Sequence, residues 1–323
     1  MWKGLIVLLG FSSFESNVDG KRLAVEKCNE YQEESSISSF IISLTMHATP
    51  LNFKTYNCSN VVQLVSGGEI ARDGEFPHHA LLGYNKSGTE NEYVFRCGGT
   101  LISDRHVLTA AHCFKTDYPS IVRLGEYDLM IFTGFEYDVP IEGFLRHPEH
   151  DFGNVYNDIA LVKLKNKVSF TESIRPACLW DTEIRNVSKF VASGFGYTSM
   201  YEALPTQMAK VVLEKFPKED CFERLNVLGH FGRGIIDGQL CVGSNTEGRD
   251  TCEGDSGGPL QTVTDPSTCT FHVVGVISTG IRGCGVGKSR AVYTNVSHYL
   301  GWIEENVWGD KADSTDIYEA IWK

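Results

Sequence analysis

Three short stretches of the sequence carry a histidine, an aspartate and a serine that could act together in nucleophilic catalysis. They are LTAAHC with His112, YNDIALVKL with Asp158 and GDSGGP with Ser256. A serine hydroxyl is a weak nucleophile at neutral pH, and it needs a neighbouring base that a third group orients. Taken singly, each residue has an ordinary structural explanation, at a strand end, a turn or a glycine-rich loop. All three in this order and in these contexts favour an activated serine.

The stretch GRDTCEGDSGGP, residues 248–259, surrounds this serine with four glycines and two aspartates, Asp250 and Asp255. So much glycine indicates a backbone that bends sharply and stays bare of side chains. An ordinary glycine-rich turn is the alternative interpretation.

Short β-branched and aromatic runs, separated by Gly, Pro and Asn turns, make up most of the chain after residue 64. Examples are VFRCGGTLIS, HVLTAAHC, IALVKLK and FHVVGVIST. This texture predicts an all-β sandwich or barrel architecture. Near the end, Leu300, Ile303 and Val307 recur at helical spacing and predict a terminal helix.

The N-terminal sequence MWKGLIVLLGFSSFES predicts a secretory signal peptide over about residues 1–16, because one lysine precedes a short apolar run. A buried helix is the alternative. The formal net charge of −12 argues against a nucleic-acid or anionic-membrane partner. We therefore expect a secreted, extracellular protein.

The ten cysteines fit a disulfide set better than a metal site, because the sequence has no paired CxxC and no HExxH. Four Asn-X-Ser sequons are candidate glycosylation sites in the same compartment. They begin at Asn57, Asn85, Asn186 and Asn295.

Together these motifs resemble those of chymotrypsin-fold, trypsin-like serine proteases, in particular the secreted proteases of arthropod cascades. The resemblance covers residues 65–307 and implies two six-stranded antiparallel β-barrels with a C-terminal helix. Residues 17–64 would then be a mostly irregular prosegment or light chain, and residues 308–323 an acidic tail. Many arthropod cascade proteases carry a six-cysteine clip domain. Only Cys28 and Cys58 precede Val65, so we expect no complete clip domain.

The resemblance assigns a role to each residue of the motifs. His112 would be the general base and then the general acid, Asp158 would orient its imidazole, and Ser256 would attack the scissile carbonyl. The N–H groups of Gly254 and Ser256 would form the oxyanion hole.

Asp250 would lie at the base of the pocket for the substrate residue before the scissile bond, called P1, and would select Arg or Lys there. Gly280 would form one wall, and Ser278 with Gly280 would pair with the substrate backbone. Ala291 stands where trypsins carry a second wall glycine, and Thr279 replaces a usual aromatic residue. The extra methyl of Ala291 should narrow the pocket, which leaves the choice between Arg and Lys open, and Thr279 should remove a flat wall from the neighbouring subsite.

Asp255 has no evident place in the chemistry, and the resemblance implies that it pairs with a new α-amino group made by proteolysis. The stretch QLVSGGEIARDGEFPH resembles the usual start of the mature protease, so cleavage would fall between Leu64 and Val65. The activating protease would cut after a bulky aliphatic residue. An unrelated glycine turn beside an aspartate is the alternative.

The resemblance also implies pairings for the cysteines. These are Cys97 with Cys113, Cys221 with Cys241, Cys252 with Cys284, and Cys58 with Cys178 as a tether of the light chain. The remaining two, Cys28 and Cys269, would form a second tether, with a free or intermolecular pair as the alternative.

Three acids in one loop, Glu126, Asp128 and Glu136, resemble a structural calcium loop of the family, although solvated loop acids are the favoured explanation. The chemistry itself needs no cofactor. We expect a secreted zymogen that hydrolyses proteins after Arg or Lys in an extracellular proteolytic cascade of immune or haemolymph type, with serpin-type inhibitors as partners. A digestive or venom protease and a non-catalytic adaptor on a protease fold are the alternatives.

Overall fold

The structure is a computed structural model, and it describes residues 22–41, 51–55, 68–87, 92–181, 187–197, 205–226, 229–265, 267–280, 287–310, 312 and 318–320. The expected signal peptide and the bond between Leu64 and Val65 lie outside this part of the chain. Within it, no helix is long and apolar enough to cross a membrane.

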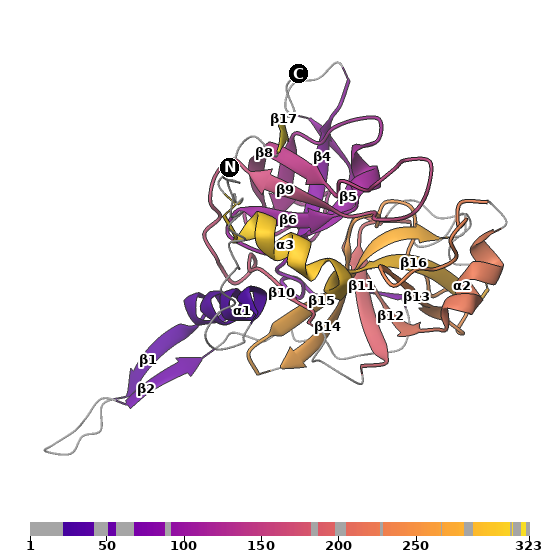
Figure 1. Cartoon of the computed structure of the whole chain (residues 1–323). Helices are drawn as coiled ribbons and strands as arrows, with labels where there is room; N and C mark the ends of the chain where they lie inside the picture. Colours follow the sequence, from indigo (N-terminus) through magenta and orange to yellow (C-terminus); the bar gives the residue numbers. More distant parts are fainter. Residues whose placement is uncertain are drawn as a thin grey trace, which may run out of the picture.

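Two closed six-stranded antiparallel β-barrels form the body of the molecule, as the sequence predicts (Figure 1). The first barrel contains β4 (His79–Asn85), β5 (Tyr93–Leu101), β6 (His106–Thr109), β7 (Ile121–Leu124), β8 (Tyr137–Arg146) and β9 (Ala160–Leu164). It closes because β8 pairs with both β7 and β9. Closure removes the free sheet edges that an open sheet would expose.

The second barrel contains β11 (Lys189–Gly194), β12 (Ala209–Lys215), β13 (Gln239–Ser244), β14 (Pro259–Asp265), β15 (Thr270–Gly280) and β16 (Ser289–Asn295). Pairing of β15 with β16 closes it. Two short strands extend its sheet: β3 (Gly68–Ile70) pairs with β12, and β10 (Cys178–Leu179) lies parallel to β15. Helix α2 (Lys218–Leu225) packs beside β13 and β16.

Apolar side chains fill the interiors of the barrels, and the terminal helix closes the structure. Helix α3 (Leu300–Val307) follows the 3-10 turn η3 (Val296–Tyr299), which confirms the predicted helix. Leu300, Ile303 and Val307 are all buried in one cluster with side chains of the first barrel. The residues that set the helical spacing are therefore the ones that hold the helix in place.

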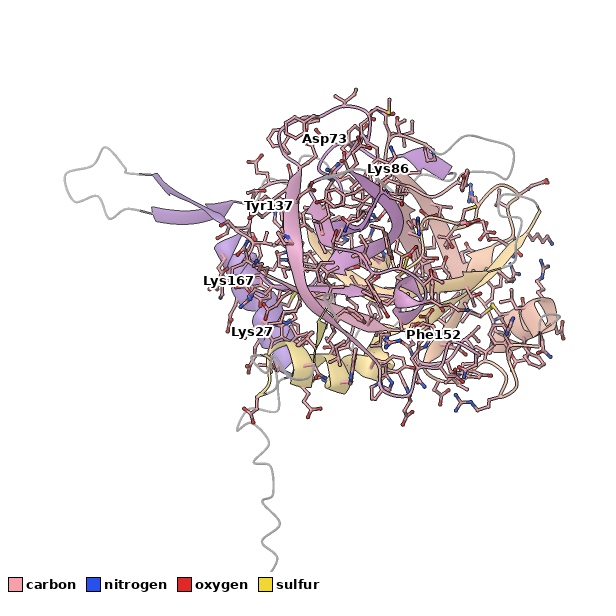
Figure 2. The ribbon with its side chains drawn as sticks, turned by 90° about the horizontal axis from the view of Figure 1, so that it is seen from above. Lys27, Asp73, Lys86, Tyr137, Phe152 and Lys167 are labelled. Atoms are coloured by element: carbon pink, nitrogen blue, oxygen red, sulfur yellow. A yellow bond between two sulfur atoms is a disulfide. The ribbon has the colours of Figure 1, made fainter. Side chains whose placement is uncertain are left out.

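The segment before the barrels is more regular than the expected irregular light chain. Helix α1 (Leu23–Glu34) is followed by a hairpin of β1 (Ile37–Ile41) and β2 (Leu51–Thr55). The hairpin pairs with neither barrel and extends away from them in two views (Figures 1 and 2).

The acidic tail also returns to the body. Strand β17 (Glu319–Ala320) pairs with Gly143 and Phe144 of β8. Tyr318 is buried, and its hydroxyl donates to the carbonyl of Asn306 at 3.1 Å. The tail therefore connects α3 to the first barrel.

Candidate active site

The first barrel positions His112 in the 3-10 turn η1 (Ala111–Phe114), directly after β6. Ala111, Cys113 and Phe114 are buried, whereas the side chain of His112 is 33% exposed. The Cys97–Cys113 disulfide ties this turn to β5. The turn is therefore fixed by its apolar neighbours, and the imidazole alone reaches the surface.

The loop between β8 and β9 presents Asp158, which is 4% exposed. Its carboxylate accepts three hydrogen bonds, from the main-chain N–H of His112 at 2.9 Å, from Nδ1 of His112 at 2.7 Å and from Oγ of Ser278 at 2.6 Å. Oγ1 of Thr294 donates to the Asp158 carbonyl at 2.7 Å. The carboxylate is thus oriented from both barrels.

Asn157, which sequence reasoning missed, sets the direction of this loop. Its φ of 51° lies in the left-handed region, which asparagine tolerates better than most residues. Its amide donates to the carbonyl of Glu149 at 3.0 Å and its oxygen accepts from the Tyr299 hydroxyl at 2.9 Å. An asparagine directly before a candidate catalytic acid was the available signal.

The histidine and the aspartate shift each other's protonation. Burial disfavours the charged Asp158, but the imidazole of His112 and its hydrogen bonds outweigh burial and lower the pKa of Asp158. Burial likewise disfavours the imidazolium, but the charge of Asp158 outweighs it and raises the pKa of His112 above its usual value. Because an ionised carboxylate only accepts hydrogen bonds, the neutral imidazole carries its proton on Nδ1, and Nε2 is left as a base.

The glycine-rich loop holds Ser256 between the two barrels. Its carbonyl accepts the N–H of Gly98 in β5 at 2.8 Å, while the N–H of Gly257 donates to Ile277 in β15 at 2.8 Å. Gly257 has a φ of 79°, and a Cβ there would lie 2.2 Å from Oγ1 of Thr109. Gly254 has a φ of 103°. These glycines therefore do what the sequence predicts: they let the loop turn and pack closely.

The carboxylate of Asp255 is enclosed by main-chain groups. It accepts the N–H of Gly196 at 2.8 Å and that of Cys252 at 2.9 Å. A Cβ at Gly194 or Gly196 would lie 2.1 or 2.6 Å from the carboxylate. The motif ASGFG, which sequence reasoning passed over, is therefore the receptacle for this side chain.

Asp250 and Asp255 line one cavity of about 310 Å³. Glu69 and Ile70 of β3 line it as well, so the strand that follows the expected cleavage bond borders the cavity that holds both aspartates. Burial raises the pKa of Asp250 to about 7 and that of Asp255 to about 6. Both carboxyl groups are therefore costly to ionise in this state of the chain.

Gly280 and Ala291 are cross-strand partners at the end of the β15–β16 ladder. A Cβ on Gly280 would lie 3.4 Å from Cβ of Ala291, which is ordinary contact distance. The two residues thus lie side by side, but neither lines the cavity that contains Asp250. The hydroxyl of Tyr293 in β16 lies 2.7 Å from that of Thr251. This hydrogen bond fixes the residue directly after Asp250.

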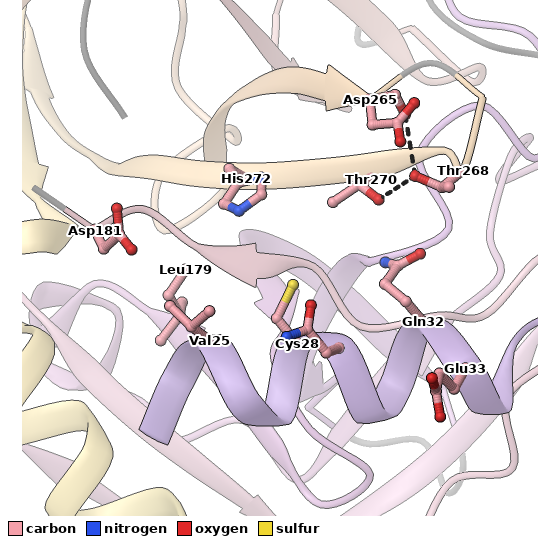
Figure 3. Close-up of a pocket in the computed structure, with 11 residues that line it drawn as sticks. Val25, Cys28, Gln32, Glu33, Leu179, Asp181, Asp265, Thr268, Thr270 and His272 are labelled. Carbon is pink, nitrogen blue, oxygen red and sulfur yellow. Dashed lines mark hydrogen bonds between the residues drawn. The ribbon is translucent and has the colours of Figure 1, made fainter. Parts of the chain in front are cut away.

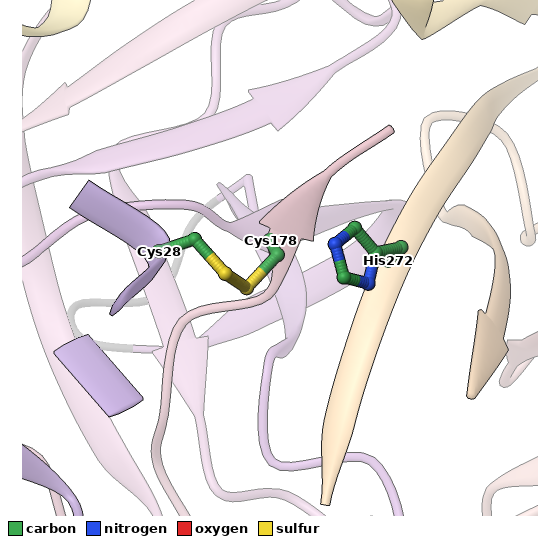
Figure 4. Close-up of side chains that lie close together, drawn as sticks. All are labelled: Cys28, Cys178 and His272. Atoms are coloured by element: carbon green, nitrogen blue, oxygen red, sulfur yellow. A yellow bond between two sulfur atoms is a disulfide. The ribbon is translucent and has the colours of Figure 1, made fainter. Parts of the chain in front are cut away.

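The disulfides correct part of the predicted pairing. Cys97–Cys113 and Cys221–Cys241 are confirmed. The partner of Cys178 is Cys28, so the predicted Cys58–Cys178 and Cys28–Cys269 pairs are wrong (Figure 4). Cys252 and Cys269 are disulfide-bonded, while Cys58 and Cys284 lie outside the described residues.

The physical reason for the Cys28–Cys178 pair is that α1 is docked on the body of the molecule. The N–H of Ala24 donates to the Glu304 carboxylate of α3 at 2.9 Å, and Nε1 of Trp308 donates to the Tyr31 hydroxyl at 2.9 Å. These contacts place Cys28 against β10.

Between α1 and the β14–β15 hairpin lies a cavity of about 600 Å³ with His272 on its far wall (Figure 3).

The three acids of the expected calcium loop each have protein partners. Glu126 pairs with Arg123 at 3.3 Å, Asp128 accepts the N–H of Met130, and Glu136 accepts three hydrogen bonds from Thr133 and Gly134. Within the described part of the chain, the carboxylate oxygens of these three acids do not all lie within 4.8 Å of one another. The calcium site therefore stays a prediction.

Two of the four sequons are described. Asn85 is exposed at the end of β4, and its oxygen accepts the hydroxyl of Ser120 at 2.8 Å. Asn295 is half-buried, and its amide donates to the carbonyl of Asp237 at 3.0 Å. Asn57 and Asn186 lie outside the described residues.

Comparison with known proteins gives consistent matches. The family model described as Trypsin matches residues 65–303. The chain is 36% identical to Serine protease snk of Drosophila melanogaster over 295 residues, which is 90% of this chain and 66% of that protein. It is 36% identical to Serine protease Hayan of Drosophila melanogaster, covering 76% of this chain and 39% of that protein. It is 36% identical to Phenoloxidase-activating factor 3 of Holotrichia diomphalia, covering 75% and 72%. The chain thus spans less than two thirds of the first two relatives.

Proposed function

Since the chain belongs to the trypsin family of serine endopeptidases, we propose that it cleaves other proteins through an acyl-enzyme formed on Ser256. The observation that carries this proposal is the clamp on His112, whose Nδ1 and main-chain N–H both bind Asp158. That clamp leaves Nε2 as the base on the side away from Asp158. The first barrel, which carries His112, also holds the serine loop, because the N–H of Gly98 donates a hydrogen bond to the Ser256 carbonyl.

The reaction follows from these groups. Nε2 of His112 takes the hydroxyl proton of Ser256 as Oγ bonds to the scissile carbonyl carbon. The N–H groups of Gly254 and Ser256 stabilise the resulting oxyanion. His112 then gives its proton to the leaving amine as the C–N bond breaks, and water hydrolyses the ester by the same steps in reverse order.

We propose that the chain is secreted as a zymogen and is activated by cleavage between Leu64 and Val65. The cavity that contains Asp255 supports this, because β3 lines it and Gly68 is only three residues from Val65. Three extended residues reach about 10 Å. The new α-ammonium group would neutralise a carboxylate whose burial is otherwise costly.

The proposed substrate side chain is Arg or Lys, because the Asp250 carboxylate lines a cavity and its described hydrogen bond comes from the main-chain N–H of Thr251, not from a cation. The methyl group of Ala291 beside Gly280 would narrow the P1 pocket. The preference between Arg and Lys at P1 is therefore to be measured.

A cascade role is proposed over a digestive one, because the Cys28–Cys178 disulfide would keep α1 attached after cleavage and the bond after Leu64 is not a basic site. The name of the phenoloxidase-activating relative points the same way. Serpin-type inhibitors would be the matching partners.

The test of substrate class is a peptide library resolved at P1, applied to protein cut between Leu64 and Val65. The expected result is cleavage after Arg and Lys at least about 100-fold faster than after Phe or Leu, since an unpaired buried carboxylate disfavours neutral side chains. A preference for Phe or Leu would contradict the assignment of Asp250.

A further inference from the structure

Two consecutive histidines at the start of β4 face the second barrel and are almost fully buried. His78 is 1% exposed and His79 is 4% exposed. The ring of His78 hydrogen-bonds Oε1 of Gln261 in β14, and Nε2 of Gln261 donates to Oγ of Ser193 in β11 at 3.2 Å. Oγ of Ser193 lies 3.3 Å from Nδ1 of His79. Four buried side chains from three strands thus form one hydrogen-bond chain between the barrels.

The donors and acceptors in this chain have one consistent order. His78 donates to the oxygen of Gln261, and the amide of Gln261 donates to Ser193. The Ser193 hydroxyl then has its own hydrogen to donate to Nδ1 of His79. Burial lowers the pKa of His78 to about 4 and that of His79 to about 3, so both rings are neutral in this arrangement.

The hydrogen-bond chain between His78 and His79 lies beside both halves of the candidate active site. Ser193 immediately precedes the segment of Gly194 and Gly196, the two glycines that enclose the Asp255 carboxylate. The ring of Phe195 lies 5.9 Å from that of His79. On the other side, the ring carbon Cε1 of His79 lies 3.6 Å from where a Cβ of Gly98 would stand.

Gly98 is the residue whose N–H binds the carbonyl of Ser256. The His79 ring therefore packs near Phe195 of the segment that receives Asp255 and lies close to Gly98, which holds the nucleophile loop.

We propose that this buried chain positions segment 193–196, and that His79 is a positioning residue that keeps the Asp255 receptacle in its competent form after cleavage. The inference rests on the proposed function, because it requires that Asp255 anchors the active conformation. Loss of these hydrogen bonds should shift the cleaved protein toward an inactive conformation. The molecules that stay active should keep the same chemistry.

His106 provides a matched control within the same molecule. It is 5% exposed, its Nδ1 lies 3.0 Å from Oγ of Ser103, and its Nε2 is buried without a hydrogen-bond partner, as is Nε2 of His79. The two histidines therefore have the same kind of environment. Only His79 borders on the Asp255 receptacle.

The experiment compares full-length wild type with His79→Leu, His79→Asn, Ser193→Ala and His106→Leu, each cut between Leu64 and Val65. Active sites are titrated with a fluorophosphonate that labels the serine, and kcat and KM are referred to the titrated sites. His79→Asn keeps an acceptor near the position of Nδ1, whereas His79→Leu removes it. Ser193→Ala removes the link with a small change in volume and serves if His79→Leu does not fold.

The expected result is that His79→Leu and Ser193→Ala lower the ratio of titratable to non-titratable protein about 5-fold, the effect of losing roughly one hydrogen bond. Turnover and KM per titrated site stay at the wild-type values, and His79→Asn restores most of the fraction. His106→Leu lowers the melting temperature but leaves the fraction unchanged.

Three results would overturn the inference: full titration of both His79→Leu and Ser193→Ala, no recovery in His79→Asn, or an equal loss in His106→Leu. If cleaved wild type is not labelled at all, the proposed function itself fails and the inference fails with it. If wild type is labelled and the variants match it, only the inference fails.

Discussion

The carboxylate of Asp158 binds His112 twice, at the main-chain N–H (2.9 Å) and at Nδ1 (2.7 Å). One bond fixes where the carboxylate lies relative to the backbone of the turn, and the other fixes the ring. The two together leave the imidazole little rotational freedom. The resulting orientation is what the proposed chemistry requires.

Replacing Asp158 by Asn should keep the fold and lower kcat of the cleaved protein about 10,000-fold, the value for this change in the family's template enzyme. The amide would donate to Nδ1 and so place the imidazole proton on Nε2. Steady-state kinetics measure the effect, with Asp138→Asn, a partly exposed acid paired with Arg123, as the control. Retention of more than about a tenth of the activity would be incompatible with the assigned role.

The pH dependence of kcat/KM should have an acidic limb with its midpoint above the ordinary value for histidine, because Asp158 raises the pKa of His112. Only the neutral imidazole can accept the serine proton, so activity rises as pH increases through that pKa. A stopped assay between pH 5 and pH 9 locates the midpoint. A midpoint below about 6 would contradict the electrostatic account.

Ser278→Ala should lower kcat/KM by about 10-fold, because the Asp158 carboxylate loses one of its three hydrogen bonds. The acidic limb should move at the same time, since fewer donors stabilise the ionised carboxylate. Thr279→Ala is the neighbouring control, because Thr279 has no contact with Asp158 in its described bonds. Equal losses in both variants would point to disturbance of the strand instead.

Asp255→Asn should stabilise the uncut precursor at alkaline pH and abolish activity after cleavage. Burial raises the pKa of Asp255 to about 6, whereas in the unfolded chain it is about 4. A raised pKa contributes stability below pH 4 that is lost as pH rises through 6, by about 3 kcal/mol.

Urea unfolding of the two precursors should therefore show a gap at pH 8 that closes near pH 4. Taking the difference between the two proteins removes the opposite effect of the buried histidines, whose lowered pKa values cost stability as pH falls. A gap that does not change with pH would contradict the buried, unpaired carboxylate.

Peptide mapping without reduction should recover Cys28 linked to Cys178. After cleavage at residue 64, the light chain should stay attached until the disulfides are reduced. Recovery of a Cys58–Cys178 peptide would contradict the docking of α1 on the body of the molecule.

The sequence predicts the parts of the site that lie within contiguous motifs. His112, Asp158, Ser256 and the glycines of the serine loop stand in strings whose local context is specific. The strand texture predicts an all-β architecture, and the family resemblance implies its two barrels. The receptacle formed by Gly194 and Gly196 was missed, because its meaning depends on a carboxylate 59 residues away.

The partner of Cys28 could not be predicted, since the sequence offers two prosegment cysteines and no measure of which approaches Cys178. Helix α1 is likewise weakly marked in the sequence, because Glu304 and Trp308 at the other end of the chain hold it. The sequence marks residues 308–323 only as an acidic tail, yet Tyr318 is buried by contacts with the folded first barrel and with α3. In each case the cause is a tertiary contact.

The central claim is that cleavage between Leu64 and Val65 creates a reactive serine at position 256. The most direct measurement is mass spectrometry of the protein treated with an organophosphonate before and after that cleavage. The account predicts one adduct, on Ser256, that forms rapidly only in the cut protein and is absent in His112→Ala. Equal labelling of the uncut chain, or no adduct on Ser256 after complete cleavage, would contradict it.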